Sequence, residues 1–309
     1  MKKNIPSLAV VLSLAAMPLA APAAPAGKAI RCGMCDEWNQ PAAPFKIHGN
    51  TWYVGTAGLS SVLVTSPEGH VLIDGALPQS APLIRKNIEA LGFRMRDIKV
   101  ILNSHPHFDH AGAIAELQRA SGATVIASPH AAQVLRDGTP GEDDPQYDPK
   151  DRYHIPKVAG VREIADGKSV AVGPLRLTVH YTPGHTPGGT SWSWESCEQG
   201  ACAVIVYADS LTAVSTDGFY YSGDATRPDL SASFRKTIAR IADMPCDVLV
   251  TAHPSFSDLF AKAANRKDGA NPFVDPQACR KLASASSRNF EARLQREREE
   301  KAKTAAAGR

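Results

Sequence analysis

Hydrophobic residues in the first half of the chain occur in short runs that are separated by polar turns. Runs rich in β-branched and aromatic residues predict strands at 51–55, 61–65, 70–74, 100–102 and 124–127. Apolar residues at helical spacing predict helices at 83–91 and 111–120. The first half therefore indicates a sheet that is covered by helices.

The second half repeats this pattern. Strands are predicted at 175–181, 191–194, 204–207 and 248–250, and helices at 233–241 and 277–303, with fraying expected over 304–309. The intervening segment 137–156 is rich in Asp, Pro and Gly, lacks periodicity and predicts a long loop. Two halves of this kind predict an α/β protein built as a four-layer αββα sandwich, in which two mixed sheets are flanked by helices.

The first 26 residues differ in composition from the rest of the 309-residue chain. Lys2 and Lys3 precede an apolar stretch at 5–19, and small residues follow it. This pattern predicts a signal peptide over residues 1–26, cleaved after Ala23 or Ala26, and a periplasmic location. Residues 27–309 are then expected to form one domain, which leaves no membrane segment in the mature form.

Charge gives no support for a nucleic-acid partner. Without Lys2 and Lys3, 32 basic residues face 31 acidic ones, a net charge of about +1. A protein so close to neutrality has no basic surface excess for a polyanion or an anionic membrane. We therefore expect no nucleic-acid or membrane partner for the mature protein. We also expect a monomer that acts on a small molecule, two expectations to which the net charge does not contribute.

Six cysteines follow the predicted signal, and an even number in an exported protein favours disulfides. Cys197 and Cys202 flank a turn between two predicted strands, so we expect them to pair. Cys246 and Cys279 lie beside a strand and the start of the last helix and could pair. The remaining two, in Cys32-Gly-Met-Cys35, could form an N-terminal disulfide or a redox pair.

Three predicted strands are each followed by histidines. The groups are His105, His107, Asp109 and His110 after 100–102, His185 after 175–181, and His253 after 248–250. Imidazole and carboxylate are good zinc ligands, and side chains at strand ends can converge on one edge of a sheet. Two three-ligand zinc sites are predicted, each with an open position for water, which is typical of a catalytic centre.

The run from His105 to His110 matches the pattern H-x-H-x-D-H, and the segments 72–75, 182–186 and 252–254 add to the match. With these motifs the chain resembles the metallo-β-lactamase superfamily, which implies the αββα fold. The resemblance implies that His105, His107 and His185 hold one zinc ion, and that Asp109, His110 and His253 hold a second. It also implies that Asp74 lies behind the ligands and orients them.

The segment Asp209-Ser210-Leu211-Thr212 carries no cysteine, and in this it is similar to class B β-lactamases of the third subclass. Cys246 with Cys279 also looks like a disulfide of that subclass. The resemblance implies that Ser210 and Thr212 contact the substrate carboxylate. It further implies that the β-lactam amide bond of penicillins, cephalosporins or carbapenems is opened by a metal-bound hydroxide, which Asp109 orients, and that this confers antibiotic resistance.

Other interpretations stay open at this point. Asp209 could support the ligands from behind, or could bridge both metals as in glyoxalase-type hydrolases, which would suit an exported thioesterase or lactonase. A closed, non-catalytic metal site is a further alternative. Gln146, Tyr220 and Tyr221 are residues of unassigned role near the predicted site.

Overall fold

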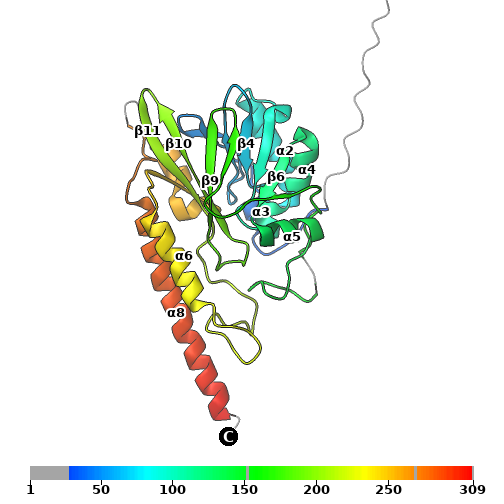
Figure 1. Ribbon diagram of the computed structural model, residues 1–309, viewed down its shortest axis with the longest axis vertical. Helices are drawn as coiled ribbons and strands as arrows, with labels where there is room; N and C mark the ends of the chain where they lie inside the picture. The colour runs from blue at the N-terminus through cyan, green and yellow to red at the C-terminus, as the bar shows by residue number, and fades with distance from the viewer. Residues whose placement is uncertain (1–27, 151–152, 268–269, 308–309) are drawn as a thin grey trace, which may run out of the picture.

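The computed structural model describes residues 28–150, 153–267 and 270–307. The predicted signal peptide lies outside the described residues. Two sheets lie face to face, with α2, α4 and α5 on one outer face and α6 and α8 on the other (Figure 1). This arrangement confirms the predicted αββα sandwich.

The first sheet has seven strands in the order of the sequence. They are β1 (Phe45–His48), β2 (Thr51–Tyr53), β3 (Val62–Val64), β4 (His70–Ile73), β5 (Ile98–Leu102), β6 (Thr124–Ala127) and β7 (Arg162–Glu163). Strands β1 to β4 pair antiparallel and β4 to β7 pair parallel, so the sheet is mixed. The helices on its outer face are α2 (Ala81–Ala90), α4 (Ile114–Ser121) and α5 (Pro129–Asp137).

The second sheet has five strands in the order β12-β11-β10-β9-β8. They are β8 (Ser169–Val172), β9 (Leu175–Tyr181), β10 (Thr190–Glu198), β11 (Ala201–Ala208) and β12 (Val248–Thr251). Only β11 and β12 pair parallel, and the other pairs are antiparallel. Helices α6 (Ser231–Asp243) and α8 (Ala278–Ala307) cover its outer face.

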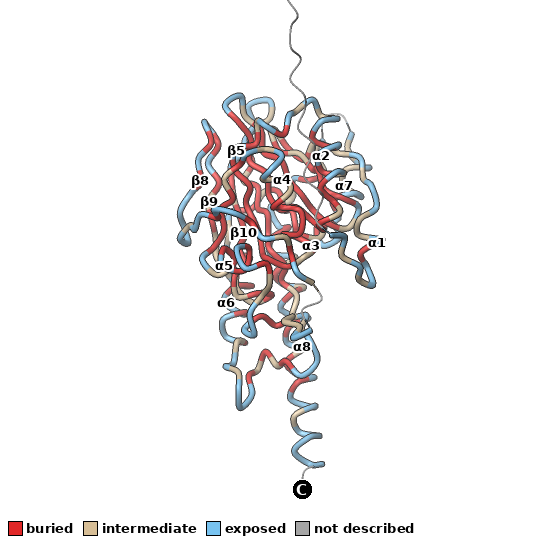
Figure 2. The backbone as a smooth tube through the Cα atoms, turned by 90° about the vertical axis from the view of Figure 1, so that its right-hand side faces the viewer, coloured by how far each residue is buried: buried red, intermediate tan, exposed pale blue. Residues whose placement is uncertain are grey.

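Buried side chains form three layers, which is what four layers of secondary structure require. Between the sheets, Trp192 and Tyr207 are fully buried beside many β-branched residues. A second cluster fills the space under α2, α4 and α5, and a third, with Phe234 and Phe290, lies under α6 and α8. Figure 2 shows this buried interior in the body of the molecule, while the far end of α8 is exposed.

Short helices connect the main elements. They are α1 (Cys35–Trp38), η1 (Pro78–Ser80), η2 (Met95–Asp97), α3 (Phe108–Ala111), η3 (Pro254–Ser257) and α7 (Leu259–Ala264). The predicted helix at 111–120 is wrong at its start, because α3 ends at Ala111 and α4 begins only at Ile114. Between them the backbone of Gly112 approaches Pro78 so closely that a Cβ atom would lie 2.3 Å from its ring.

The six cysteines form three disulfides, Cys32–Cys35, Cys197–Cys202 and Cys246–Cys279. The pairing expected across the β10–β11 turn is confirmed, and so is the pair that was left possible beside β12 and α8. Cys246–Cys279 ties the segment before β12 to the first turn of α8. None of the helices in the described parts of the chain has the length and apolar character needed to cross a bilayer.

Candidate metal centre

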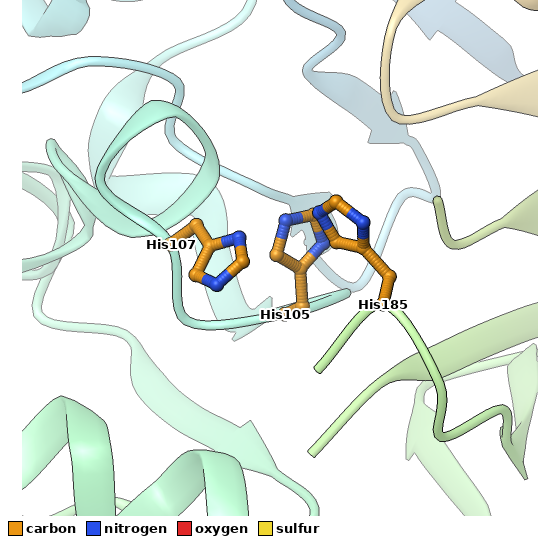
Figure 3. A group of neighbouring side chains, drawn as sticks. All are labelled: His105, His107 and His185. Carbon is orange, nitrogen blue, oxygen red and sulfur yellow. The ribbon is translucent and has the colours of Figure 1, made fainter. Parts of the chain in front are cut away.

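The parallel strands direct the candidate ligands to one edge of the molecule. Strands β4 and β5 lie parallel, as do β11 and β12, so their carboxyl ends are neighbours within each sheet. His105 follows β5, and His253 follows β12, while His185 lies in the connection from β9 to β10. The rings of His105 and His107, from one loop, and of His185, from another, gather in one place (Figure 3).

His105, His107 and His185 form the first cluster. Their donor nitrogens lie within 4.8 Å of one another, and all three residues are buried. His105 Nε2 is buried and has no hydrogen-bond partner among the described residues. A buried nitrogen without a partner is costly, and a metal ion in the cluster would satisfy it. The donor set therefore fits a zinc ion.

Asp109, His110 and His253 form the second cluster, beside the first. The Oδ2 atom of Asp109 lies 3.3 Å from His110 Nε2 and 3.5 Å from His253 Nε2. The two imidazole nitrogens are themselves 3.3 Å apart. Two nitrogens and one carboxylate oxygen at such distances also suit zinc, and they leave a fourth position open. The structure thus brings together all six predicted ligands.

In three of these imidazole rings, the Nδ1 atom has a hydrogen-bond partner within the protein. His105 Nδ1 lies 2.7 Å from Asp209 Oδ1, His185 Nδ1 lies 2.9 Å from the Thr212 carbonyl oxygen, and His253 Nδ1 lies 3.1 Å from that of Gly58. Such partners hold the ring orientation and the tautomer that exposes the other nitrogen to a metal. Asp209 is thereby placed behind His105.

Asp144 is a buried carboxylate that was not predicted from the sequence. Both of its oxygens lie 3.1 Å from His107 Nε2, and its side chain is fully buried. It belongs to the long loop at 137–156, where a single Asp among many polar residues carries no periodic signal. No pattern in the sequence distinguishes it from the exposed Asp143 beside it.

The Asp74 carboxylate accepts hydrogen bonds from the loop that follows β5. Its Oδ1 accepts hydrogen bonds from the Ser104 backbone N–H and the Asn103 amide, and its Oδ2 accepts them from Ser104 Oγ and the Tyr207 hydroxyl. His110 Nδ1 lies 3.8 Å from Asp74 Oδ2. The φ angle of Asp74 is +61°, which is uncommon for a non-glycine residue. Asp74 therefore lies where an acid supporting the ligand loop was predicted.

Burial sets the charge states of the cluster in the metal-free chain. It lowers the pKa of His105 well below its usual value, and it lowers the pKa of His185 to about 3. Burial alone would raise the pKa of Asp109, but His110 and His253 hold that pKa well below its usual value. Neutral imidazoles beside an ionised carboxylate are the states that a zinc ion requires.

Ser210 and Thr212 line a cavity of about 490 Å³ between the segment 209–214, η3 and α8. Thr212 also contacts His185 Nδ1 through its hydroxyl, at 3.1 Å, so it has a structural contact besides its predicted one with substrate. Tyr221 is fully buried and packs against Phe234 and Phe290, away from the clusters.

Gln146 reaches the first cluster from the long loop. Its Nε2 lies 3.3 Å from His107 Nδ1 and 3.2 Å from His185 Nε2. These are the two ring nitrogens that would bind an ion, so the amide and the ion would compete for them. Tyr220 lies beside α8, where the Lys301 ammonium is 5.0 Å from the centre of its ring.

Residues 55–255 match the family model of the metallo-beta-lactamase superfamily. With its αββα fold and histidine clusters, the chain belongs to this superfamily of metal-dependent enzymes and is a hydrolase. The chain is similar to the solved structure of MEM-A1, a subclass B3 metallo-beta-lactamase from a soil metagenome library, at 48% identity and a TM-score of 0.82. That match covers 85% of this chain and 99% of MEM-A1.

The Rm3 metallo-beta-lactamase is similar at 52% identity and a TM-score of 0.83, over 87% of this chain and 99% of Rm3. Curated relatives are instead hydroxyacylglutathione hydrolases, such as that of Anaeromyxobacter dehalogenans, 31% identical over 46% of this chain and 43% of the relative. The first three such matches span between 27% and 64% of the relatives' length. The structural neighbours thus share far more of the chain than the curated relatives do.

Proposed function

We propose that this protein opens the β-lactam ring of penicillins, cephalosporins and carbapenems with two zinc ions, and that it confers resistance to them. The observation that carries this proposal is the pair of adjacent three-ligand clusters, each of which leaves a position open. Similarity to subclass B3 enzymes over nearly their whole length supports it. Each cluster supplies three protein ligands, whereas a structural zinc site is closed by four.

His105, His107 and His185 would hold one ion, and Asp109, His110 and His253 the other. Bound zinc polarises a carbonyl oxygen and lowers the pKa of coordinated water to about 7, which supplies hydroxide at neutral pH. The ionised carboxylate of Asp109 can accept a hydrogen bond from the attacking water and orient it. No nucleophilic side chain is needed.

We propose that Ser210 and Thr212 contact the substrate. Ser210 follows Asp209 directly in the chain, and the Thr212 hydroxyl lies 3.1 Å from His185 Nδ1, so both residues belong to the segment that supports the candidate ligands. A β-lactam carboxylate could accept hydrogen bonds from these two hydroxyls. This would turn the amide bond toward the clusters.

We further propose that the chain is exported to the periplasm, loses residues 1–26, and acts as a monomer of one domain over 27–309. Three disulfides support export, because such bonds persist in oxidising compartments. They also make a structural bond the simpler interpretation of Cys32–Cys35.

The second candidate function is thioester hydrolysis, which the names of the curated relatives favour. A bridging carboxylate at Asp209 would support it. Asp209 Oδ1 instead contacts His105 Nδ1, the ring nitrogen opposite the buried Nε2. This geometry supports a role for Asp209 behind the ligands, and hence the β-lactamase proposal.

Hydrolysis by the purified zinc-loaded protein tests the proposal. Loss of the β-lactam absorbance should be measured for one penicillin, one cephalosporin and one carbapenem. We expect hydrolysis that a chelator stops and that added zinc restores. Intact β-lactams in all three reactions would refute the proposed function.

A further inference from the structure

The two nitrogens of the His107 ring face different surroundings. Nδ1 points to the first cluster, where the His107 ring centre lies 4.8 Å from that of His105 and 5.0 Å from that of His185. Nε2 faces away, toward Asp144, at 3.1 Å from each carboxylate oxygen. A neutral imidazole carries one proton, and a carboxylate can only accept it. The contact therefore requires the proton on Nε2, which leaves the lone pair of Nδ1 directed at the cluster.

Asp144 is held in place by its own loop. Its Oδ1 accepts a hydrogen bond of 2.8 Å from the Gln146 backbone N–H, and its backbone N–H donates to the Gly141 carbonyl. The next residue, Pro145, accepts a hydrogen bond from the Thr216 N–H, at 2.9 Å. The loop thus presents a fully buried carboxylate in a defined position. A buried carboxylate needs such partners, because burial without them is costly.

We propose that Asp144 is a positioning residue that prepares His107 to bind the first metal ion and couples the loop at 137–150 to the metal centre. This inference rests on the proposed function, since it assumes that the clusters hold zinc. Two other rings, those of His185 and His253, are supported by backbone carbonyls. A carboxylate raises the basicity of its histidine more strongly than a neutral carbonyl does.

The same contact links the loop to substrate access. Asp144 fixes the Gln146 backbone, and the Gln146 side chain lies against His107 and His185 at the mouth of the first cluster. Loss of the Asp144 carboxylate would release both the ring and the loop. Metal affinity and loop position should therefore change together.

The test compares three variants, Asp144→Ala, Asp144→Asn and Asp143→Asn. Asp143 is the matched control, because it also pairs with a histidine, His130, at 2.8 Å, but its side chain is 59% exposed and its partner is not one of the six proposed ligands. Zinc affinity is measured by competition with a chromogenic chelator. We expect Asp144→Ala to weaken one zinc ion by about ten- to a hundredfold, Asp144→Asn to weaken it less, and Asp143→Asn to match the wild type.

Nitrogen-15 NMR of the histidine rings in the zinc-loaded wild type provides an independent readout. The ring signals that disappear in His107→Gln should show a proton on Nε2. A proton on Nδ1, or unchanged zinc affinity in Asp144→Ala, would overturn the inference. Thermal unfolding shows which variants fold. If Asp144→Ala does not fold, the zinc affinity of Asp144→Asn is compared with that of the wild type instead. Zinc binding is measured without any substrate, so it decides this inference even if no β-lactam is cleaved.

Discussion

At the scale of residues, three of the six proposed ligands already hold the protonation states that zinc needs. The rings of His105 and His185 are kept neutral by burial, and the carboxylate of Asp109 is kept ionised by its two histidine neighbours. Burial alone would lower the pKa of His107, but the Asp144 carboxylate beside it outweighs this effect and raises that pKa instead. Asp109 is the only carboxylate of the six, so it carries the charge of the second cluster.

Replacing Asp109 with Ala should lower kcat by about 10²- to 10⁴-fold, because the variant loses both a ligand and the acceptor that orients the water. The rate of β-lactam hydrolysis at saturating zinc measures this. His130→Ala is the control, since His130 pairs with the exposed Asp143 outside the clusters. Wild-type turnover in Asp109→Ala would remove the role assigned to this carboxylate.

At the scale of elements, α8 anchors the segment that follows the predicted substrate contacts. Glu297 is 1% exposed, and it accepts hydrogen bonds from the backbone N–H groups of Tyr221 and Ser222 and from the Arg293 guanidinium. Arg293 in turn donates to Ser215 Oγ and the Phe219 carbonyl. The helix thereby fixes the loop at 215–222, a few residues beyond Thr212.

Burial alone would raise the pKa of Glu297, but hydrogen bonds from Ser222 and Arg293 lower it below the ordinary value of 4.5. A lowered pKa in the folded state means that Glu297 stabilises the fold above pH 4.5 and that this contribution is lost as the pH falls through the lowered pKa. Glu297→Gln should therefore cost about 1–3 kcal/mol at pH 7 and progressively less in acid.

Urea unfolding of both proteins across the range from neutral to acidic pH measures this difference. Glu299→Gln is the matched control, because Glu299 is exposed on the same helix and accepts a hydrogen bond from the Gln295 amide. An equal loss of stability in the two variants, or a loss that does not depend on pH, would contradict the role of Glu297.

Most of the fold followed from the periodicity of the chain, because both sheets consist of runs with clear strand patterns. The gathering of the six candidate ligands was also predictable, since each histidine group follows a strand. The helix α5 was missed, as its nine residues lie between a strand and a long irregular loop. Asp144 was missed for a physical reason: its burial depends on tertiary contacts with His107 that leave no local pattern.

At the scale of the whole molecule, the metal centre joins the two sheets. Four of the ligands follow β5 in the first sheet, while His185 and His253 belong to connections of the second. An ion held by ligands from both sheets binds the folded state and not the unfolded chain. Zinc should therefore stabilise the entire sandwich.

Each zinc ion at a free concentration of a hundred times its Kd should add about 2.7 kcal/mol, which corresponds to a rise in Tm of about 5–10 °C per ion for a domain near this size. Calorimetry with zinc and with a chelator measures the shift. His185→Ala should lose much of it, because this change removes a ligand of the second sheet, while His130→Ala should keep it. An equal shift in both variants would mean that the zinc ions bind elsewhere.

A comparison of two substrate classes on one zinc-loaded preparation decides between β-lactam and thioester hydrolysis. The kcat/KM values for a β-lactam and for a hydroxyacyl thioester of glutathione are determined with and without chelator. The proposed function predicts zinc-dependent opening of the β-lactam with the higher kcat/KM. Cleavage of the thioester by a preparation that leaves the β-lactam intact would contradict it.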